Sequence, residues 1–502
     1  MSVSRHTAYN LLGSALPIAM ALVTVPMYLK LVGPDRYGVL AIAWLLLGYF
    51  GLFDLGLGRA TSFRIAALRD ASPQARANTY WAALTVNIMI GLAGGFVMWA
   101  GAGFFFAHVF KVNQSLRAEI LQGVPLLAAS VPVATLTGVA TGALQGREKF
   151  LETNTISVVS TALFQLIPLT IAFAFGPKLV WLLFGALAAR GLALLLLAYR
   201  CHIALTRGLR RRLDLNEIPT LLKYGGWVAG VSLVGPLLLI VDRFIIGAVV
   251  GAAAVAAYTI PFQFAQRIAV LPGALMNALF PKMSGASRAE FAALAEKATR
   301  TLAAVMTPMV LAGLFALGPF FDIWVGKSMS AQAAPLGRVL LIGFWANAFA
   351  LVSFTRLQAS GRPDLVTKIL LIEIAPYWLC LWLGMVWLGA WGSALAFSVR
   401  MVADYFLLTW AAGRSFKALP VLTANFCLLV GAAWLTSIFS VREMGWWMSA
   451  AALMGAALFL AWRVFPEEFR SRFAHYVIRI HPSIGHVIQG FARLETRKDK
   501  AI

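Results

Sequence analysis

Charge is scarce in this sequence, and negative charge is scarcest. Asp and Glu number 20 against 42 Lys and Arg in 502 residues, and charged residues make up only 12% of the chain, while 60% are hydrophobic. The charged share is about half that of ordinary globular proteins. Apolar runs of about 18–25 residues recur along the chain, each long enough to cross a ~30 Å hydrocarbon layer. The composition excludes a soluble domain and predicts an all-α polytopic membrane protein.

Cysteine and catalytic constellations are also lacking. The three cysteines, Cys201, Cys380 and Cys427, are odd in number and widely spaced, which argues against a disulfide framework or a metal site. No nucleophile or metal-ligand grouping occurs. The first apolar run, 11–29, is too long for a signal peptide and lacks a small-residue cleavage site after it. We therefore expect a retained first span, no catalytic residue, no metal and no cofactor.

The apolar runs predict about 14 transmembrane helices, and the even number places both termini on one side of the membrane. The expected spans are 9–30, 38–58, 79–106, 119–143, 153–175, 179–199, 224–249, 255–278, 301–325, 336–356, 366–388, 390–412, 419–440 and 445–463.

Basic residues set the orientation. With cytoplasmic termini, the inner segments hold 30 Lys and Arg, the outer loops hold eight, among them Arg36 and Arg338, and four arginines lie within spans. This bias follows the positive-inside rule. The same distribution argues against nucleic-acid binding, because the basic residues follow loops rather than one face.

The long basic connection after the sixth span suggests two six-helix lobes plus two appended helices. We expect an N-lobe at 1–200, a cytoplasmic linker at 201–223, a C-lobe at 224–412, two further spans at 413–463 and an amphipathic cytoplasmic tail at 464–502.

Two weak repeats agree with two lobes. YLKLVGPDRYGVLAIA (28–43) and IIGAVVGAAAVAAYTI (245–260) share a helix, a glycine turn and a second helix. FGALAARGLALLL (184–196) and GSALAFSVRMVADYFLL (392–408) share the element ALA followed by an arginine. Internal repeats of this kind are usual in transporters.

The opening of the chain resembles a known family. Asn10, Pro17, Pro26, the G-x-x-x-Y-G turn at 33–38 and the DLGLG stretch at 54–58 are similar to the start of bacterial Wzx-type oligosaccharide flippases, members of the MOP (multidrug/oligosaccharidyl-lipid/polysaccharide) exporter superfamily, which includes the MATE transporters. The second half matches again at 242–243, Gly251 and Tyr258.

The resemblance implies a two-lobed, fourteen-helix flippase with a central cavity. Such a protein would move undecaprenyl-diphosphate-linked oligosaccharides from the cytoplasmic to the periplasmic leaflet by alternating access, for lipopolysaccharide and other cell-surface polysaccharide synthesis. It would lie in the bacterial inner membrane, act as a monomer, contact membrane lipids and work beside the polymerase machinery. A gradient of H+ or Na+, or the membrane potential, would drive it.

The pair Asp242 and Arg243 stands inside an apolar run. An intramembrane charge costs roughly 2.5–3.5 kcal/mol on insertion scales and usually marks a functional site. Adjacent helical residues point about 100° apart, so we expect each to find a partner elsewhere rather than form a simple mutual pair. One interpretation is an anion-binding arginine beside an orienting or proton-handling acid. The alternative is an interhelical ion pair that fixes packing.

A polar face is predicted in the eighth span. Gln263, Gln266 and Arg267 lie at i, i+3 and i+4 between two prolines, Pro261 and Pro272, which would loosen the helix. Amide donors and a guanidinium suit sugar hydroxyls and phosphate. Interhelical hydrogen bonding is the alternative.

Four further intramembrane residues are candidates. Arg400 and Asp404 lie at i and i+4 and are expected to pair within one helix. Arg190 has no acid on its own helix, so it is either an anion site or the partner of an acid such as Asp242 or Glu373. Glu373 is a candidate proton carrier, with a neutral or paired structural carboxyl as the alternative.

The cytoplasmic end of the second span carries Asp54, Arg59 and Arg64. These residues could meet an incoming lipid headgroup, although a charged helix end at the interface is the more ordinary interpretation.

Two other functions stay open. A multidrug antiporter of the same fold would export organic cations and would need acids, with few arginines, deep in its cavity. A membrane polymerase or ligase would need a large outer loop to hold sugar acceptors, and the sequence offers none.

Overall fold

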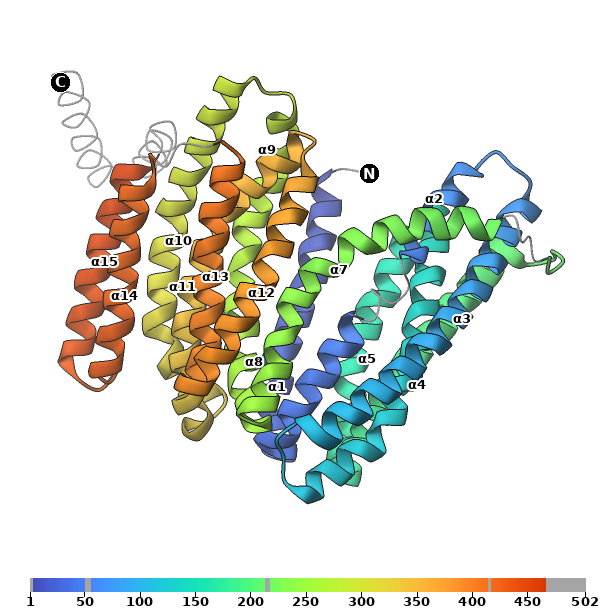
Figure 1. The fold of residues 1–502 in the computed structure, drawn as a ribbon, viewed down its shortest axis with the longest axis horizontal. Coiled ribbons are helices and arrows are strands. Elements are labelled where there is room, and N and C mark those ends of the chain that lie inside the picture. The colour runs from blue at the N-terminus through green and yellow to red at the C-terminus, as the bar shows by residue number, and fades with distance from the viewer. Residues whose placement is uncertain (1–2, 50–55, 213–216, 414–416, 466–502) are drawn as a thin grey trace. The chain divides into compact units, whose positions relative to one another are not determined.

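The computed structural model describes residues 3–49, 56–212, 217–413 and 417–465, and within these ranges every regular element is a helix (Figure 1). The elements are α1 (Val3–Tyr49), α2 (Leu57–Ala67), α3 (Pro73–Phe104), η2 (Phe105–Val109), α4 (Gln114–Gly146), α5 (Phe150–Phe175), α6 (Leu179–Cys201), η3 (His202–Thr206), α7 (Glu217–Val249), α8 (Ala252–Gln266), η4 (Arg267–Ala269), α9 (Val270–Ser284), α10 (Arg288–Trp324), α11 (Lys327–Ala359), α12 (Pro363–Leu388), α13 (Ala390–Ala411), α14 (Leu419–Ile438) and α15 (Met444–Val464).

The all-α polytopic architecture is confirmed. Ten helices of the described chain are long and apolar enough to cross a membrane: α3 to α6 and α10 to α15. Three other expected spans fall on the first segment of α1, on α7, and on α8 with η4 and α9, and the span 38–58 begins on the second segment of α1 and continues into residues outside the described ranges. The count of about fourteen spans is consistent with this arrangement.

Both predicted glycine turns are present. Gly33 has φ 78° and ψ 166° and kinks α1 into two segments. Gly251, with φ 127°, separates α7 from α8. These backbone conformations are open to glycine but strained for other residues. The two turns meet, because Gly38 packs so closely on the carbonyl group of Ala252 that no Cβ would fit between them.

Local sequence explains where several helices begin. Ser72 caps α3, with Pro73 in the first helical position, and its hydroxyl accepts from Ala75 N at 3.2 Å. Asn113 caps α4 by accepting from Leu116 N at 2.9 Å. Ser287 and Glu290 form a capping box at α10.

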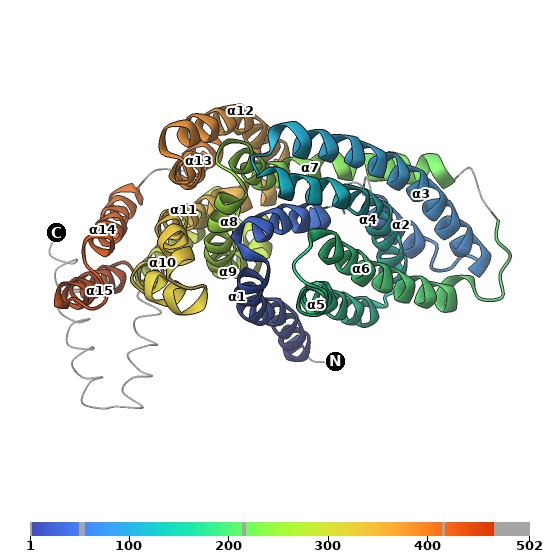
Figure 2. The same cartoon turned by 90° about the horizontal axis from the view of Figure 1, so that it is seen from below.

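The chain forms two compact units. Residues 1–259 with 378–393 form the first, and residues 260–377 with 394–502 form the second. In the first unit α3 packs on α4 and α5 packs on α6, and these pairs lie side by side in Figure 2. In the second unit α10 packs on α11, α14 and α15. The predicted lobe and linker boundaries stay a prediction.

Helix α11 overturns one prediction. Arg338, counted among the outer-loop residues, lies inside α11, which begins eleven residues earlier at Lys327. The segment 327–335 is only weakly apolar, which is typical of a loop, yet its three alanines, methionine and glutamine favour a helix. Asp54 and nearly all of the expected tail, 466–502, lie outside the described residues.

Candidate substrate site

The charged pair of α7 is fully buried. Asp242 and Arg243 are 0% and 1% exposed, and Tyr258 on α8 is 0% exposed. Arg243 Nη1 donates to both carboxylate oxygens of Asp242, at 2.6 and 2.7 Å. The hydroxyl of Tyr258 donates to Asp242 Oδ2 at 2.9 Å, and the Arg243 guanidinium lies 5.1 Å from the centre of the tyrosine ring. The three groups form one polar cluster that joins α7 to α8.

The expectation that these neighbours would not pair with each other is wrong. The 100° separation of adjacent side chains holds at Cβ, but the arginine stem is long enough to fold back on the carboxylate. The expected partner on another helix is also present, as Tyr258. Full burial and mutual neutralisation support the packing interpretation, because the guanidinium charge is already balanced. The role of Arg243 in substrate binding stays a prediction.

The polar face predicted in the eighth span lies where the helix changes form. Gln263 and Gln266 are in the last turn of α8, and Arg267 opens the 3-10 segment η4 that leads into α9. The prolines at 261 and 272 flank this change, as predicted. Gln263 is half-buried, whereas Gln266 and Arg267 are exposed.

A second buried cluster joins α12 to α13. The ion pair of Arg400 is formed with Glu373, from Nε to Oε2 at 3.2 Å. The expected pair with Asp404, one turn along α13, is therefore wrong, because Glu373 reaches the guanidinium from α12. Asp404 lies in the same cluster, and its Oδ1 has no hydrogen-bond partner in the described chain. Two carboxylates therefore lie close to one arginine here, and Glu373 is the one that forms the ion pair.

Arg190 has a different environment. It lies on α6, and its guanidinium sits over the ring of Phe164 on α5, 4.7 Å from the centroid. Neither acid proposed as its partner serves that role, because Asp242 pairs with Arg243 and Glu373 pairs with Arg400. Its Nε is buried without a hydrogen-bond partner in the described structure.

Of the arginines inside the expected spans, three form no ion pair with a carboxylate in the described ranges: Arg190, Arg267 and Arg338. Sequence reasoning passed over Arg338 because it was counted with the outer-loop residues, although it lies two residues inside the expected span 336–356. Its Nε is buried, and its guanidinium packs against Gly318 of α10, where a Cβ would lie 3.2 Å from Nη2.

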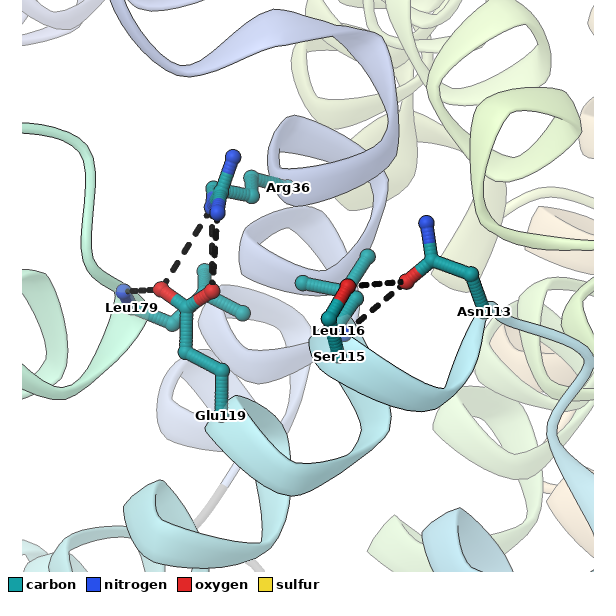
Figure 3. A network of polar contacts seen from close by, with 6 residues as sticks. All are labelled: Arg36, Asn113, Ser115, Leu116, Glu119 and Leu179. Atoms are coloured by element: carbon teal, nitrogen blue, oxygen red, sulfur yellow. Dashed lines mark hydrogen bonds and ion pairs between the residues drawn. The ribbon is translucent and has the colours of Figure 1, made fainter.

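A further ion pair fixes the helices around Arg190. Glu119 on α4 accepts from Arg36 of α1, at 3.1 Å from Nε and 3.0 Å from Nη2 (Figure 3). The same carboxylate accepts the backbone N–H of Leu179, the first residue of α6. A carboxylate at a helix N-terminus satisfies a free donor and opposes the positive end of the helix dipole. Glu119 thus ties α1, α4 and α6 together.

The two described residues of the proposed entrance, Arg59 and Arg64, have different environments. Arg59 is exposed on α2. Arg64 donates to both oxygens of Glu217 at the start of α7, at 2.8 and 2.6 Å, and Thr79 donates to the same carboxylate at 3.2 Å. The Arg64 hydrogen bond holds the pKa of Glu217 below its usual value. Arg64 therefore connects α2 to α7.

Among the residues the structure describes, no group of three or more His, Cys, Asp and Glu side chains is placed to hold a metal ion.

Comparison with known proteins agrees with this architecture. The profile of a family described as "Polysaccharide biosynthesis protein" matches residues 3–287, more than half of the chain. A Shigella flexneri protein described as "Putative O-antigen transporter" is 28% identical over 413 residues, covering 82% of this chain and 97% of the relative.

Solved structures share the fold at low identity. The lipid II flippase MurJ, in an inward closed conformation, aligns with a TM-score of 0.70 and 13% identity, covering 92% of this chain and 99% of that one. An inward-facing MATE multidrug transporter of the MOP superfamily aligns with a TM-score of 0.65 and 14% identity, covering 84% and 99%. The protein is thus an all-α, multi-pass membrane protein that shares its fold with the MATE transporter and with MurJ, and it belongs to the polysaccharide biosynthesis protein family.

Proposed function

We propose that this protein is a flippase that moves undecaprenyl-diphosphate-linked oligosaccharides from the cytoplasmic to the periplasmic leaflet by alternating access. The family description, the O-antigen transporter of Shigella flexneri and the fold shared with a lipid II flippase support transport of a lipid-linked glycan. The protein would then supply cell-surface polysaccharide synthesis as a transporter, without catalysing a reaction.

The observation that carries the proposal is the set of arginines without a carboxylate partner in the described chain. Arg267 and Arg338 in the second unit and Arg190 in the first lie in or beside membrane helices with no acid to balance them. An unbalanced guanidinium is costly within a membrane. A diphosphate would supply the missing negative charge, and the planar guanidinium fork matches phosphate oxygens in a bidentate geometry.

The deep carboxylates count against the organic-cation antiporter. A cation carrier needs carboxylates that are free to receive a positive substrate. Asp242 and Glu373 are instead each paired with an arginine, at 2.6 and 3.2 Å, and Asp404 is buried beside the pair of Glu373 and Arg400. The charge pattern therefore favours an anionic substrate.

The site assignment follows from these differences. Arg267, with Gln263 and Gln266 beside it, is the leading ligand for diphosphate and sugar, and Arg338 joins it in the same unit. Asp242, Arg243 and Arg400 contribute mainly to packing, and Arg59 marks the cytoplasmic entrance.

The cellular setting and the coupling complete the proposal. The protein would lie in the inner membrane with both termini in the cytoplasm, as a monomer beside the polymerase machinery. Glu373, which pairs with Arg400, and Asp404 in the same cluster are the candidates for coupling to H+ or Na+. The membrane potential is the other candidate energy source.

The test is leaflet translocation in proteoliposomes that contain the purified protein. A polyprenyl-diphosphate oligosaccharide and a cationic dye are offered separately. Movement of the glycolipid alone is the expected result. Movement of the dye alone, coupled to a proton gradient, would overturn the proposal and assign the protein to the multidrug branch.

A matched pair of variants tests the site. Arg267→Gln is expected to lower glycolipid translocation at least about tenfold, since a charge-assisted contact is lost, while the protein stays folded in the membrane. Arg442→Gln, which changes an exposed arginine between α14 and α15, serves as the control and is expected to transport normally. Equal transport by both variants would remove Arg267 from the site.

A further inference from the structure

The first unit holds a cluster of hydrogen-bond donors without acceptors. Arg190 on α6 is half-buried, with its guanidinium 4.7 Å from the centroid of Phe164 and its Nε buried and unbonded within the described structure. A buried donor without an acceptor costs about 1–3 kcal/mol. Buried polar groups in native proteins are nearly always hydrogen bonded, so this one requires an explanation.

Trp44 supplies a second buried donor without an acceptor beside the ring of Phe164. It lies on the second segment of α1, half-buried, with its ring centroid 6.3 Å from that of Phe164 and 5.0 Å from that of Tyr28. Its indole N–H is buried and has no acceptor in the described part of the chain. One phenylalanine ring is thus flanked by two donors, one of them charged.

The polar groups nearby are already engaged with each other. The hydroxyl of Tyr28 donates to the backbone oxygen of Gln165 at 2.7 Å, and the hydroxyl of Thr24 donates to its side-chain oxygen at 3.1 Å. Gln165 follows Phe164 directly on α5. Both of these Gln165 oxygens therefore serve other donors, and neither bonds to Arg190 Nε or to the Trp44 indole.

The framework around the cluster is fixed rather than loose. Glu119 joins the second segment of α1, which carries Trp44, to α6, which carries Arg190. Trp44 and Phe164 also pack against the buried side chains of Leu47, Val131 and Ala186. The two donors are held in place before any ligand arrives, which lowers the entropic cost of binding.

We propose that Arg190, Trp44 and Phe164 form a glycan subsite that binds a carboxylate-bearing sugar unit of the transported oligosaccharide. The carboxylate would accept hydrogen bonds from the Arg190 guanidinium, a ring or hydroxyl oxygen would accept from the Trp44 indole, and the apolar face of the sugar would pack on the aromatic rings. This inference rests on the proposed function. It assigns the glycan to the first unit and leaves the diphosphate to Arg267 and Arg338.

The alternative ligand of Arg190 is the diphosphate of the carrier lipid. Binding measurements on purified protein in detergent separate the two sources. The probes are cellobiouronic acid, which carries one carboxylate, the neutral disaccharide cellobiose, and farnesyl diphosphate, which carries the diphosphate without sugar. Isothermal titration calorimetry gives the Kd of each for the wild-type protein and for the variants.

We expect cellobiouronic acid to bind more tightly than cellobiose. Arg190→Gln should weaken cellobiouronic acid at least about tenfold and leave farnesyl diphosphate unchanged. Trp44→Phe keeps an aromatic ring but removes the N–H, and should weaken the acidic disaccharide about threefold. Arg267→Gln should show the reverse selectivity, weakening farnesyl diphosphate alone, and Arg442→Gln is the neutral control.

Several outcomes would overturn the subsite. They are a wild-type protein that binds neither disaccharide, a Kd for cellobiouronic acid unaffected by Arg190→Gln, and a loss confined to farnesyl diphosphate in that variant. The last would assign Arg190 to the carrier diphosphate. A thermal stability of Arg190→Gln well below that of wild type would indicate a structural role instead, since removing an unpartnered buried charge should not destabilise the fold.

Failure of this inference is distinguishable from failure of the proposed function. If wild-type proteoliposomes move the polyprenyl-diphosphate oligosaccharide but Arg190→Gln leaves sugar binding intact, only the subsite is wrong. If cellobiouronic acid binding depends on Arg190 but the glycolipid is not moved, the subsite stands and the flippase proposal is wrong.

Discussion

The buried cluster on α7 and α8 provides a quantitative test of how this protein keeps charge inside the membrane. The substitution Asp242→Asn removes the carboxylate that balances Arg243 while preserving the size of the side chain. Arg243 would remain 1% exposed with its charge no longer neutralised by Asp242. We expect a large loss of stability from this single change.

The magnitude follows from the geometry. Breaking a buried ion pair by removing one partner costs about 3–5 kcal/mol, because an uncompensated buried charge remains. The double variant Asp242→Asn, Arg243→Gln removes both charges and should recover most of that loss. Tyr258→Phe deletes only the hydroxyl that donates to Asp242 at 2.9 Å, and should cost about 1.5–3 kcal/mol, as expected for a hydrogen bond to a charged group.

The assay is the fraction of monodisperse protein that survives heating in detergent, measured by size-exclusion chromatography for the wild type and the three variants. The expected order of stability is wild type first, then Tyr258→Phe with the double variant near it, and Asp242→Asn last. A single variant as stable as the wild type, or a double variant less stable than the single one, would refute the view that Asp242 and Arg243 neutralise each other.

Other regions of the first unit give sharper local tests. In Gly38→Ala the new Cβ would lie 2.8 Å from the carbonyl carbon of Ala252, so overpacking should cost about 1–3 kcal/mol of stability. The control Gly101→Ala, in open space on α3, should be neutral or stabilising. Equal melting temperatures for the two variants would contradict the close packing of Gly38. Glu119→Ala leaves the first N–H of α6 without its acceptor and should cost about 0.5–2 kcal/mol, measured by thermal stability. The pKa of Glu217 is lowered, so the ionised carboxylate stabilises the fold above about pH 4.3, the usual glutamate value, and this stabilisation is lost as pH falls through the lowered pKa. The difference in melting temperature between Glu217→Gln and wild type should therefore shrink in acid. A difference that stays constant with pH would mean that the pKa of Glu217 is unshifted.

Much of the fold was accessible from sequence because membrane spans follow from length and hydropathy. The helix–turn–helix repeats at Gly33 and Gly251 were also predictable, because positive φ angles select glycine. Arg338 was assigned wrongly because a helix can begin in a weakly apolar segment when neighbouring helices bury it. Hydropathy describes transfer to lipid and does not register burial against protein.

The charged residues were found by their position in apolar runs, but their partners could not be predicted. Sequence spacing suggested a pair between Arg400 and Asp404, whereas Glu373 on another helix takes the arginine. Spacing along one helix also excluded a pair that a flexible arginine stem then formed at Arg243. Ion pairing in this protein depends on side-chain reach and on which helices adjoin, and neither quantity is contained in the periodicity of a single segment.

The division of the arginines into balanced and unbalanced groups accounts for the scarcity of acid in the chain. Where an arginine holds helices together, an acid accompanies it, as Asp242 does Arg243 and Glu373 does Arg400. Where the substrate is to supply the anion, an added acid would compete with it. The two groups should therefore respond oppositely to neutral substitution. Removing Arg243 or Arg400 should destabilise the fold, because a buried carboxylate is left without its counter-charge. Removing Arg190 or Arg267 should leave stability unchanged or raised but weaken substrate binding, which is the trade-off expected when an unbalanced charge is kept for binding.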